Sequence, residues 1–198
     1  MCSRLGRAAL LACALAVSLA ACAQPAPGAQ ASADRAVGGP FTLVDQDGRP
    51  VDQRVLNGKW SIVFFGYTFC PDFCPTTLTA LGQTMTLLGP KAQDMQVVFI
   101  TVDPERDTPR QLKTYLSSRV FPRNIIGLTG TPDQVAQAAR EYDVYYRKDG
   151  SGPNYTVDHS TVLYLMDPTA RFRGPLADGE TPQQQAQEIV RAMDGAPA

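Results

Sequence analysis

Three nearly continuous apolar segments, separated by stretches with helical spacing, constrain the fold of this chain more than any other feature of its sequence. The segments are residues 60–67, 97–102 and 161–166. Such runs are typical of strands that are covered on both faces of a sheet, because a strand with one wet face carries polar residues at alternate positions. The sequence therefore predicts a central sheet between layers of helices.

Four further stretches carry apolar side chains at the three- and four-residue spacing of an amphipathic helix. They cover residues 78–88, 112–116, 135–142 and 186–193. Because strands alternate with helices along the chain, we expect a single layered α/β domain, with the sheet flanked by helices.

Turn-rich stretches predict three hairpins around this framework. Residues 41–44 and Val51 flank one such stretch and should form an N-terminal edge hairpin. A second, inserted hairpin is expected near residues 143–157. Its two adjacent tyrosines either form a surface for a partner or are ordinary strand residues. The strand at 161–166 runs through a third turn into Phe172 and should therefore lie antiparallel to the earlier strands. The central sheet is expected to be mixed.

Three of the four helices carry the same start signal, a Thr-Pro pair with Gln three residues after the Thr. The threonines are Thr108, Thr131 and Thr181. Each signal predicts a capping box, in which the Thr and Gln side chains satisfy backbone groups of the first turn. In the same register the remaining helix begins at Cys74, where a thiol replaces the hydroxyl. A helix start without the usual capping residue is expected more often at a functional site than elsewhere in the fold.

Length and charge exclude two classes of function. The 198 residues, 44% of them hydrophobic, are enough to bury one core and too few for a multi-domain machine. Lys and Arg number 18 against 19 Asp and Glu, without a basic run, so the chain offers no electrostatic attraction for nucleic acid. We therefore expect no nucleic-acid partner.

The first residues are predicted to direct the chain to a membrane. Arg4 and Arg7 precede an apolar run, residues 8–21, that is shorter than the roughly 20 residues of a spanning helix. The run closes on Leu-Ala-Ala before Cys22, which resembles a bacterial lipoprotein signal, where cleavage precedes a cysteine that receives diacylglycerol. The alternatives are an ordinary signal peptide that contains Cys22 and an uncleaved anchor.

This interpretation divides the chain into three parts. Residues 1–21 are the predicted lipoprotein signal peptide, residues 22–40 a lipid-anchored flexible linker rich in Ala, Gly and Pro, and residues 41–198 the folded domain. We expect an exported protein, anchored by its lipid to a membrane on the periplasmic side of the bacterial cell envelope.

Any cysteine chemistry must use Cys70 and Cys74. Of the five cysteines, Cys2 and Cys13 lie in the predicted signal and Cys22 would carry lipid. The remaining pair follows an expected strand and precedes a helix, and a helix N-terminus lowers the pKa of a thiol. One alternative is a structural disulfide, although a clasp over three residues removes little chain entropy. The gap is also one residue wider than that of the usual redox pair, which favours metal chelation.

The single histidine, His159, precedes the expected antiparallel strand, which should begin where the parallel strands end. We therefore expect it beside the cysteines, the alternative being an ordinary surface or core histidine. Two thiolates and one imidazole favour Cu(I) over Zn²⁺, because structural zinc normally has four protein ligands.

Three acidic residues flank the expected site. Asp72 lies between the cysteines, and Asp103 follows the strand at 97–102, so both are candidates to tune the metal from outside its ligand shell. Asp107 directly precedes the capping Thr108, where it would favour the helix N-terminus.

At these motifs the sequence resembles the Sco/SenC proteins. The matching stretches are residues 65–68, 70–75, 102–109, 127–132 and 155–160, in the family's order. The resemblance implies a thioredoxin-like fold and one copper ion, as Cu(I) or Cu(II), bound by Cys70, Cys74 and His159. It also implies that the two cysteines cycle between dithiol and disulfide.

The same resemblance implies a metallochaperone that delivers copper to, or reduces, the dinuclear copper site of cytochrome c oxidase. The implied partner is the copper-bearing oxidase subunit, and a second copper chaperone or a thioredoxin-like reductant of the periplasm is a further candidate. The alternatives are a thioredoxin-like thiol-disulfide oxidoreductase or peroxidase, and a redox sensor. The oxidoreductase alternative is weakened because no proline directly precedes the last apolar strand, where thioredoxin-like enzymes carry a cis-proline.

Overall fold

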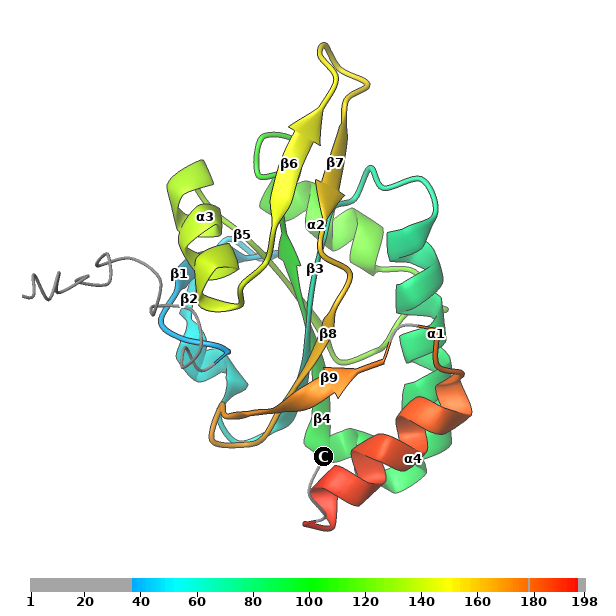
Figure 1. Cartoon of the computed structure of the whole chain (residues 1–198). Helices are drawn as coiled ribbons and strands as arrows, with labels where there is room; N and C mark the ends of the chain where they lie inside the picture. Colours follow the sequence, from blue (N-terminus) through cyan, green and yellow to red (C-terminus); the bar gives the residue numbers. More distant parts are fainter. Residues whose placement is uncertain (1–36, 178, 196–198) are drawn as a thin grey trace, which may run out of the picture. The chain divides into compact units, whose positions relative to one another are not determined.

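The computed structural model describes residues 37–177 and 179–195 of the chain (Figure 1). Seven strands form the central sheet, in the order β2-β1-β5-β4-β3-β8-β9, and β6 and β7 form a separate two-stranded hairpin. The central strands are β1 (Thr42–Asp45), β2 (Pro50–Asp52), β3 (Trp60–Gly66), β4 (Met95–Thr101), β5 (Ile125–Thr129), β8 (Leu163–Met166) and β9 (Phe172–Leu176). The hairpin strands are β6 (Tyr146–Asp149) and β7 (Thr156–His159).

Four α-helices and two short 3-10 helices connect the strands. The α-helices are α1 (Phe73–Leu88), α2 (Pro109–Leu116), α3 (Pro132–Glu141) and α4 (Pro182–Met193), and the 3-10 helices are η1 (Gln53–Leu56) and η2 (Gly89–Asp94). All four expected helices are therefore present. Among the described residues, no helix is both long and apolar enough to cross a membrane.

The strand directions bring the carboxyl ends of β3, β4 and β5 and the start of β8 to the same edge of the sheet. β3, β4 and β5 are parallel, so their carboxyl ends meet at this edge. β8 pairs antiparallel with β3 and begins there, as expected, while β1 pairs antiparallel with β5. The predicted mixed sheet is confirmed. The inserted hairpin is confirmed too, and it projects beyond the same edge (Figure 1).

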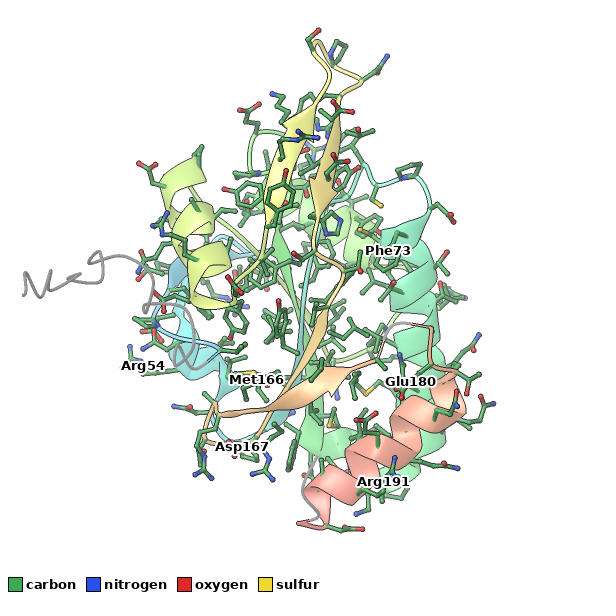
Figure 2. All side chains as sticks on the ribbon, viewed as in Figure 1. Arg54, Phe73, Met166, Asp167, Glu180 and Arg191 are labelled. Carbon is green, nitrogen blue, oxygen red and sulfur yellow. The ribbon has the colours of Figure 1, made fainter. Side chains whose placement is uncertain are left out.

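Side chains on the two faces of the sheet build two cores (Figure 2). On β3, Val63 and Phe65 pack into the core beneath α3, whereas Ile62 and Phe64 pack into the core beneath α1, α2 and α4. Both faces of the central strands are therefore dry, which explains their continuous apolar sequence.

The helix starts confirm the capping pattern in part. Thr131 and Thr181 form complete capping boxes with the glutamines three residues on. At α2, Thr108 accepts a hydrogen bond from the Gln111 N–H, but the Gln111 side chain donates to the Thr68 hydroxyl instead of closing the box. This glutamine therefore links α2 to the loop that follows β3.

The predicted register of α1 was wrong. The helix begins at Phe73 after Asp72, so Cys74 lies inside the first turn instead of capping it. Its N–H donates to the Cys70 sulfur at 3.4 Å. The capping acceptor is therefore the sulfur of the other cysteine, an arrangement that a Thr-type cap register does not predict.

The predicted signal peptide, the lipid site at Cys22 and the linker up to residue 36 lie outside the described residues. Residues 37–40 contact the domain: the Gly38 N–H donates to the Glu141 carbonyl at 2.8 Å, and the Gln137 side chain donates to the Pro40 carbonyl at 3.2 Å. The described part of the predicted linker therefore lies against α3.

Candidate metal centre

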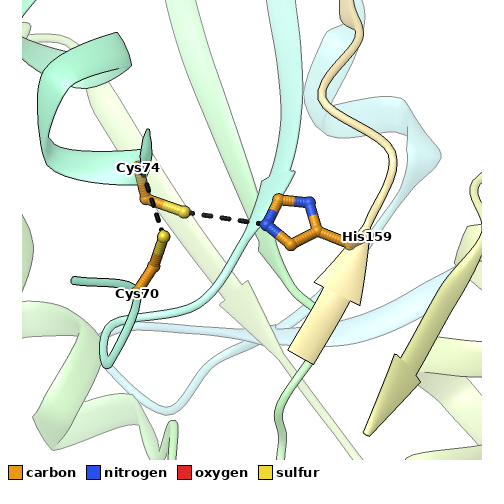
Figure 3. Close-up of side chains that lie close together, drawn as sticks. All are labelled: Cys70, Cys74 and His159. Carbon is orange, nitrogen blue, oxygen red and sulfur yellow. Dashed lines mark hydrogen bonds between the residues drawn. The ribbon is translucent and has the colours of Figure 1, made fainter. Parts of the chain in front are cut away.

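The structure brings Cys70, Cys74 and His159 together (Figure 3). Each side chain offers one possible ligand atom, and these atoms all lie within 4.8 Å of one another. The three residues could therefore hold a metal ion. Cys70 comes from the loop after β3, Cys74 from the first turn of α1 and His159 from the end of β7. Three separate segments therefore supply one candidate ligand each.

The two thiols differ in burial and in acidity. Cys74 is fully buried, whereas Cys70 is partly exposed. Hydrogen bonds from the Cys74 thiol and from the N–H groups of Cys74 and Asp72 lower the pKa of Cys70 to about 5, against the cost of burial. Sharing that hydrogen bond with Cys70, together with burial, raises the pKa of Cys74. At neutral pH the pair is therefore a Cys70 thiolate beside a Cys74 thiol.

The imidazole of His159 presents a lone pair to the sulfurs. Its Nδ1 lies 2.8 Å from the Ser160 carbonyl oxygen, which can only accept, so Nδ1 carries the proton. In the neutral imidazole Nε2 then carries the lone pair, and it lies 3.9 Å from the Cys74 sulfur. The ring packs edge-on against Tyr67, with centroids 5.9 Å apart. The Tyr67 hydroxyl accepts a hydrogen bond from the Val157 N–H at 3.3 Å, which ties β7 to the cysteine loop.

Gly66, the last residue of β3, makes room for the Cys74 sulfur. A Cβ atom at this position would lie 2.8 Å from that sulfur and 2.9 Å from the Phe99 ring, closer than carbon atoms approach without displacement. The glycine is therefore required by the close approach of the thiol, at the point where strand and helix meet.

Asp107 anchors the cysteine loop, a role that its position before Thr108 did not predict. Its carboxylate is fully buried and accepts from the Thr68 N–H at 3.0 Å, the Thr68 hydroxyl at 2.6 Å and the Thr101 hydroxyl at 2.6 Å. Burial raises its pKa, and these donors oppose that effect. The contacts join the loop after β3 to the end of β4 and so fix the start of the loop that carries Cys70.

Asp72 and Asp103 lie outside the ligand group. Asp72 is exposed at the start of α1, where its carboxylate accepts from the Thr76 hydroxyl at 3.4 Å. Asp103 is buried and forms an ion pair with Arg106, and it also accepts a hydrogen bond from the Tyr155 hydroxyl. Asp72 therefore reaches the site through its backbone N–H, and Asp103 faces a neighbouring cluster.

Sequence reasoning did not single out Tyr67, Gly66 or Arg106, all of which surround the ligands or the segments that carry them. Gly66 and Tyr67 lie within an apolar run, where an isolated glycine was the available signal of a close backbone approach. No local pattern distinguishes Arg106 from a surface cation, because, apart from Asp103, its partners lie far away in the sequence.

Comparison with known proteins agrees with this architecture. Protein SenC of Rhodobacter capsulatus is 41% identical over 164 residues, which cover 82% of this chain and 73% of that protein. The mitochondrial SCO1 homolog 1 of Arabidopsis thaliana is 45% identical over 139 residues, which cover 69% of this chain and 41% of the relative. This second match therefore spans less than half the length of the curated relative.

The solved structure of Bradyrhizobium japonicum ScoI with copper bound superposes with a TM-score of 0.73 at 43% identity, covering 79% of this chain and 99% of that chain. This likeness confirms the expected thioredoxin-like fold. A family model, SCO1/SenC, matches residues 29–194. Because that match spans both core-forming faces of the sheet and all three candidate ligands, the chain belongs to the SCO1/SenC family.

Proposed function

We propose that this protein binds one copper ion through Cys70, Cys74 and His159, and that it delivers copper to, or reduces, the dinuclear copper site of cytochrome c oxidase. The observation that carries the proposal is the convergence of two sulfurs and one imidazole nitrogen within 4.8 Å. The copper-bound state of the Bradyrhizobium japonicum relative, at 43% identity, supports the choice of metal.

The donor set fits copper better than zinc. Thiolate and imidazole are ligands that Cu(I) accepts in low coordination numbers, whereas structural zinc normally takes four protein ligands. The chain has one histidine, and its other three cysteines precede residue 37. In this proposal the bound copper is cargo, so the protein acts as a metallochaperone with no turnover of a small molecule.

The same thiols support a redox step. When the Cys70 thiolate and the Cys74 thiol form a disulfide they release two electrons and one proton. With one further proton from water, these reduce a disulfide of the target to two thiols. The partly exposed Cys70 thiolate is suited to attack, and the adjacent Cys74 thiol is suited to resolve the mixed disulfide. This division of roles is the observation that favours a thiol-disulfide reductase as the second candidate function.

The proposal includes an attachment to a membrane. Cys22 is lipidated after cleavage of residues 1–21, and the following residues tether the domain in the bacterial cell envelope, on the periplasmic side. The motivation is the short apolar run that ends in Leu-Ala-Ala-Cys. The partners are the copper-bearing subunit of cytochrome c oxidase and a second copper chaperone or thioredoxin-like reductant in the same compartment.

Metal analysis with copper and zinc in competition tests the proposal. The full chain carries Cys2→Ser, Cys13→Ser and Cys22→Ser, so that Cys70 and Cys74 are its only thiols. We expect one copper per reduced chain, little zinc, and loss of copper after oxidation to the Cys70–Cys74 disulfide, because the metal ligands are thiolates. Full copper content in the oxidised chain, or preference for zinc, would contradict the proposal.

A further inference from the structure

Arg106 lies in a cluster beside the candidate metal centre. Its side chain is 14% exposed, and its Nε atom pairs with the buried carboxylate of Asp103. The other oxygen of that carboxylate accepts from the Tyr155 hydroxyl, so Asp103 orients both side chains. Burial of this kind makes the guanidinium a fixed structural element and not a mobile surface group.

The guanidinium stacks against aromatic rings from two segments. Its central carbon lies 3.6 Å from the ring centroid of Tyr155, 4.6 Å from that of Phe69 and 5.8 Å from that of Tyr67. Its Nη1 donates to the carbonyls of Pro153 and Tyr155, at 3.2 and 3.0 Å. A planar cation between aromatic faces gains both electrostatic and stacking energy.

These contacts join the two segments that carry the ligands. Tyr67 and Phe69 belong to the loop after β3, in which Phe69 directly precedes Cys70. Tyr155 directly precedes β7, which ends at His159. Tyr67 also links the two segments, through its contacts with Val157 and His159.

We infer that Arg106 is a positioning residue: it holds the hairpin that ends in His159 against the cysteine loop and thereby sets the affinity of the site for copper. The inference rests on the proposed copper binding by these three side chains. The hydrogen bonds and ring contacts of Arg106 are with residues other than the three proposed ligands, so its action on them passes through the rings and carbonyls of the two segments.

Geometry and charge make different demands at this position. A lysine keeps the positive charge but lacks the planar group that stacks on two rings while donating to two carbonyls. If Arg106 acted through its charge alone, Arg106→Lys would retain full copper affinity. If it acts through position, Arg106→Lys weakens copper binding in the same direction as loss of the histidine.

A double-mutant cycle tests the inference on the full chain with Cys2→Ser, Cys13→Ser and Cys22→Ser. The affinity for Cu(I) is measured by competition with a chelator in four proteins: the parent, Arg106→Lys, His159→Ala and the double variant. We expect Arg106→Lys to weaken binding about tenfold or more, as losses of positioning contacts around metal ligands do. In the His159→Ala background the same substitution should change affinity by less than about twofold, because no imidazole remains to be positioned.

The outcomes separate the inference from the proposed function. A parent chain that binds no copper overturns the proposed function. Copper binding that depends on His159 but is unchanged by Arg106→Lys, or losses that add in the double variant, overturn the positioning role alone. Arg110→Lys, an exposed substitution of the same type on α2, serves as the matched control and should leave affinity unchanged.

Two further measurements distinguish positioning from a loss of stability. The chain has one histidine, so its imidazole NMR signals belong to His159 without assignment, provided no histidine tag is present. In the metal-free protein, Arg106→Lys should broaden or shift these signals while the urea midpoint indicates a folded chain. If Arg106→Lys does not fold, Phe69→Leu is the alternative variant, because it removes one of the rings on which the Arg106 guanidinium stacks. Phe69 is 50% exposed, so its replacement should not unfold the chain. The substitution should weaken copper binding severalfold, and unchanged affinity with unchanged signals would overturn the inference.

Discussion

The Cβ atom that Gly66 lacks would lie 2.8 Å from the sulfur of Cys74. The end of β3 and the first turn of α1 are therefore packed so closely that the Cys74 sulfur, one of the proposed copper ligands, occupies the space of a missing side chain. The position of that sulfur depends on a residue that has no side chain of its own.

Gly66→Ala should therefore impair copper binding more than it impairs folding. The added methyl group displaces the Cys74 sulfur or the Phe99 ring, and we expect a loss of copper affinity of about tenfold or more, as for other disturbed ligand geometries. Overpacking of this kind costs about 1–3 kcal/mol of stability. Chelator competition and urea unfolding on the same preparation measure both effects. Thr42→Ala, at an exposed position of β1, is the control and should leave copper affinity unchanged.

His159→Ala should lower copper affinity by about an order of magnitude or more, because one of three ligands is lost. The side chain is partly exposed, so the stability should change by about 1 kcal/mol or less. Copper affinity and denaturant midpoint are compared, with Cys70→Ala as the positive control. Native copper affinity in His159→Ala would remove the histidine from the site.

The reactivity of Cys70 should rise with pH around a midpoint near 5, where its pKa lies. Below that pH the thiol is protonated and inert, and above it the thiolate reacts, whereas an unperturbed cysteine reacts with a midpoint of about 8.5. The rate of iodoacetamide labelling between pH 4 and 9, with the modified residue identified by mass spectrometry, measures the profile. Because the proton is shared by two thiols, the midpoint belongs to the pair. A midpoint above 8, or preferential labelling of the buried Cys74, would disagree with the structure.

Thr68→Val should destabilise the cysteine loop. The hydroxyl of Thr68 donates to Asp107 and accepts from Gln111, so its removal leaves the buried carboxylate with fewer donors. We expect a loss of about 1–3 kcal/mol in the free energy of unfolding, the cost typical of an unsatisfied buried group. Thr42→Val, on an exposed position of β1, is the matched control for urea unfolding. Equal stability of the two variants would mean that the Asp107 contacts contribute little.

The mature protein should begin at Cys22 and carry lipid on its sulfur. This expectation comes from the Leu-Ala-Ala-Cys ending of a run too short to span a membrane. Intact mass of the membrane-extracted protein measures it, and a Cys22→Ser variant is the control that should remain unprocessed. A different N-terminus or an unmodified mass would refute the anchor.

β3, β4, β8 and all four α-helices were predictable because their signals are local. Residues 60–67 and 97–102 read as buried strands and correspond to β3 and β4. β5 was not predicted, because Gly127 interrupts a short apolar run; a Cβ there would lie 2.5 Å from the Leu116 side chain, so the packing of α2 requires the glycine. Glycine is a poor strand former, but here a contact that exists only in the folded chain requires it within a strand.

The three candidate ligands could be predicted from their residue types and from the order and direction of the strands. The antiparallel direction of the strand after His159 was enough to place the imidazole beside the thiols. The roles of Asp107 and Arg106 were not predictable, because each depends on partners about 40 to 50 residues away. The register of α1 failed for a related reason, since its cap acceptor is a sulfur held in place by the loop.

Cys74 and His159 are separated by 85 residues, although their side chains meet at the end of the sheet. The two cysteines are close along the chain and are available to a metal ion as soon as they leave the ribosome, but the third ligand arrives only when β7 has been made and β8 has paired with β3. An unfolded or half-synthesised chain therefore offers two sulfurs, whereas the complete domain offers three donors. Copper bound by all three stabilises the native state by mass action, so metal loading discriminates finished molecules from unfinished ones.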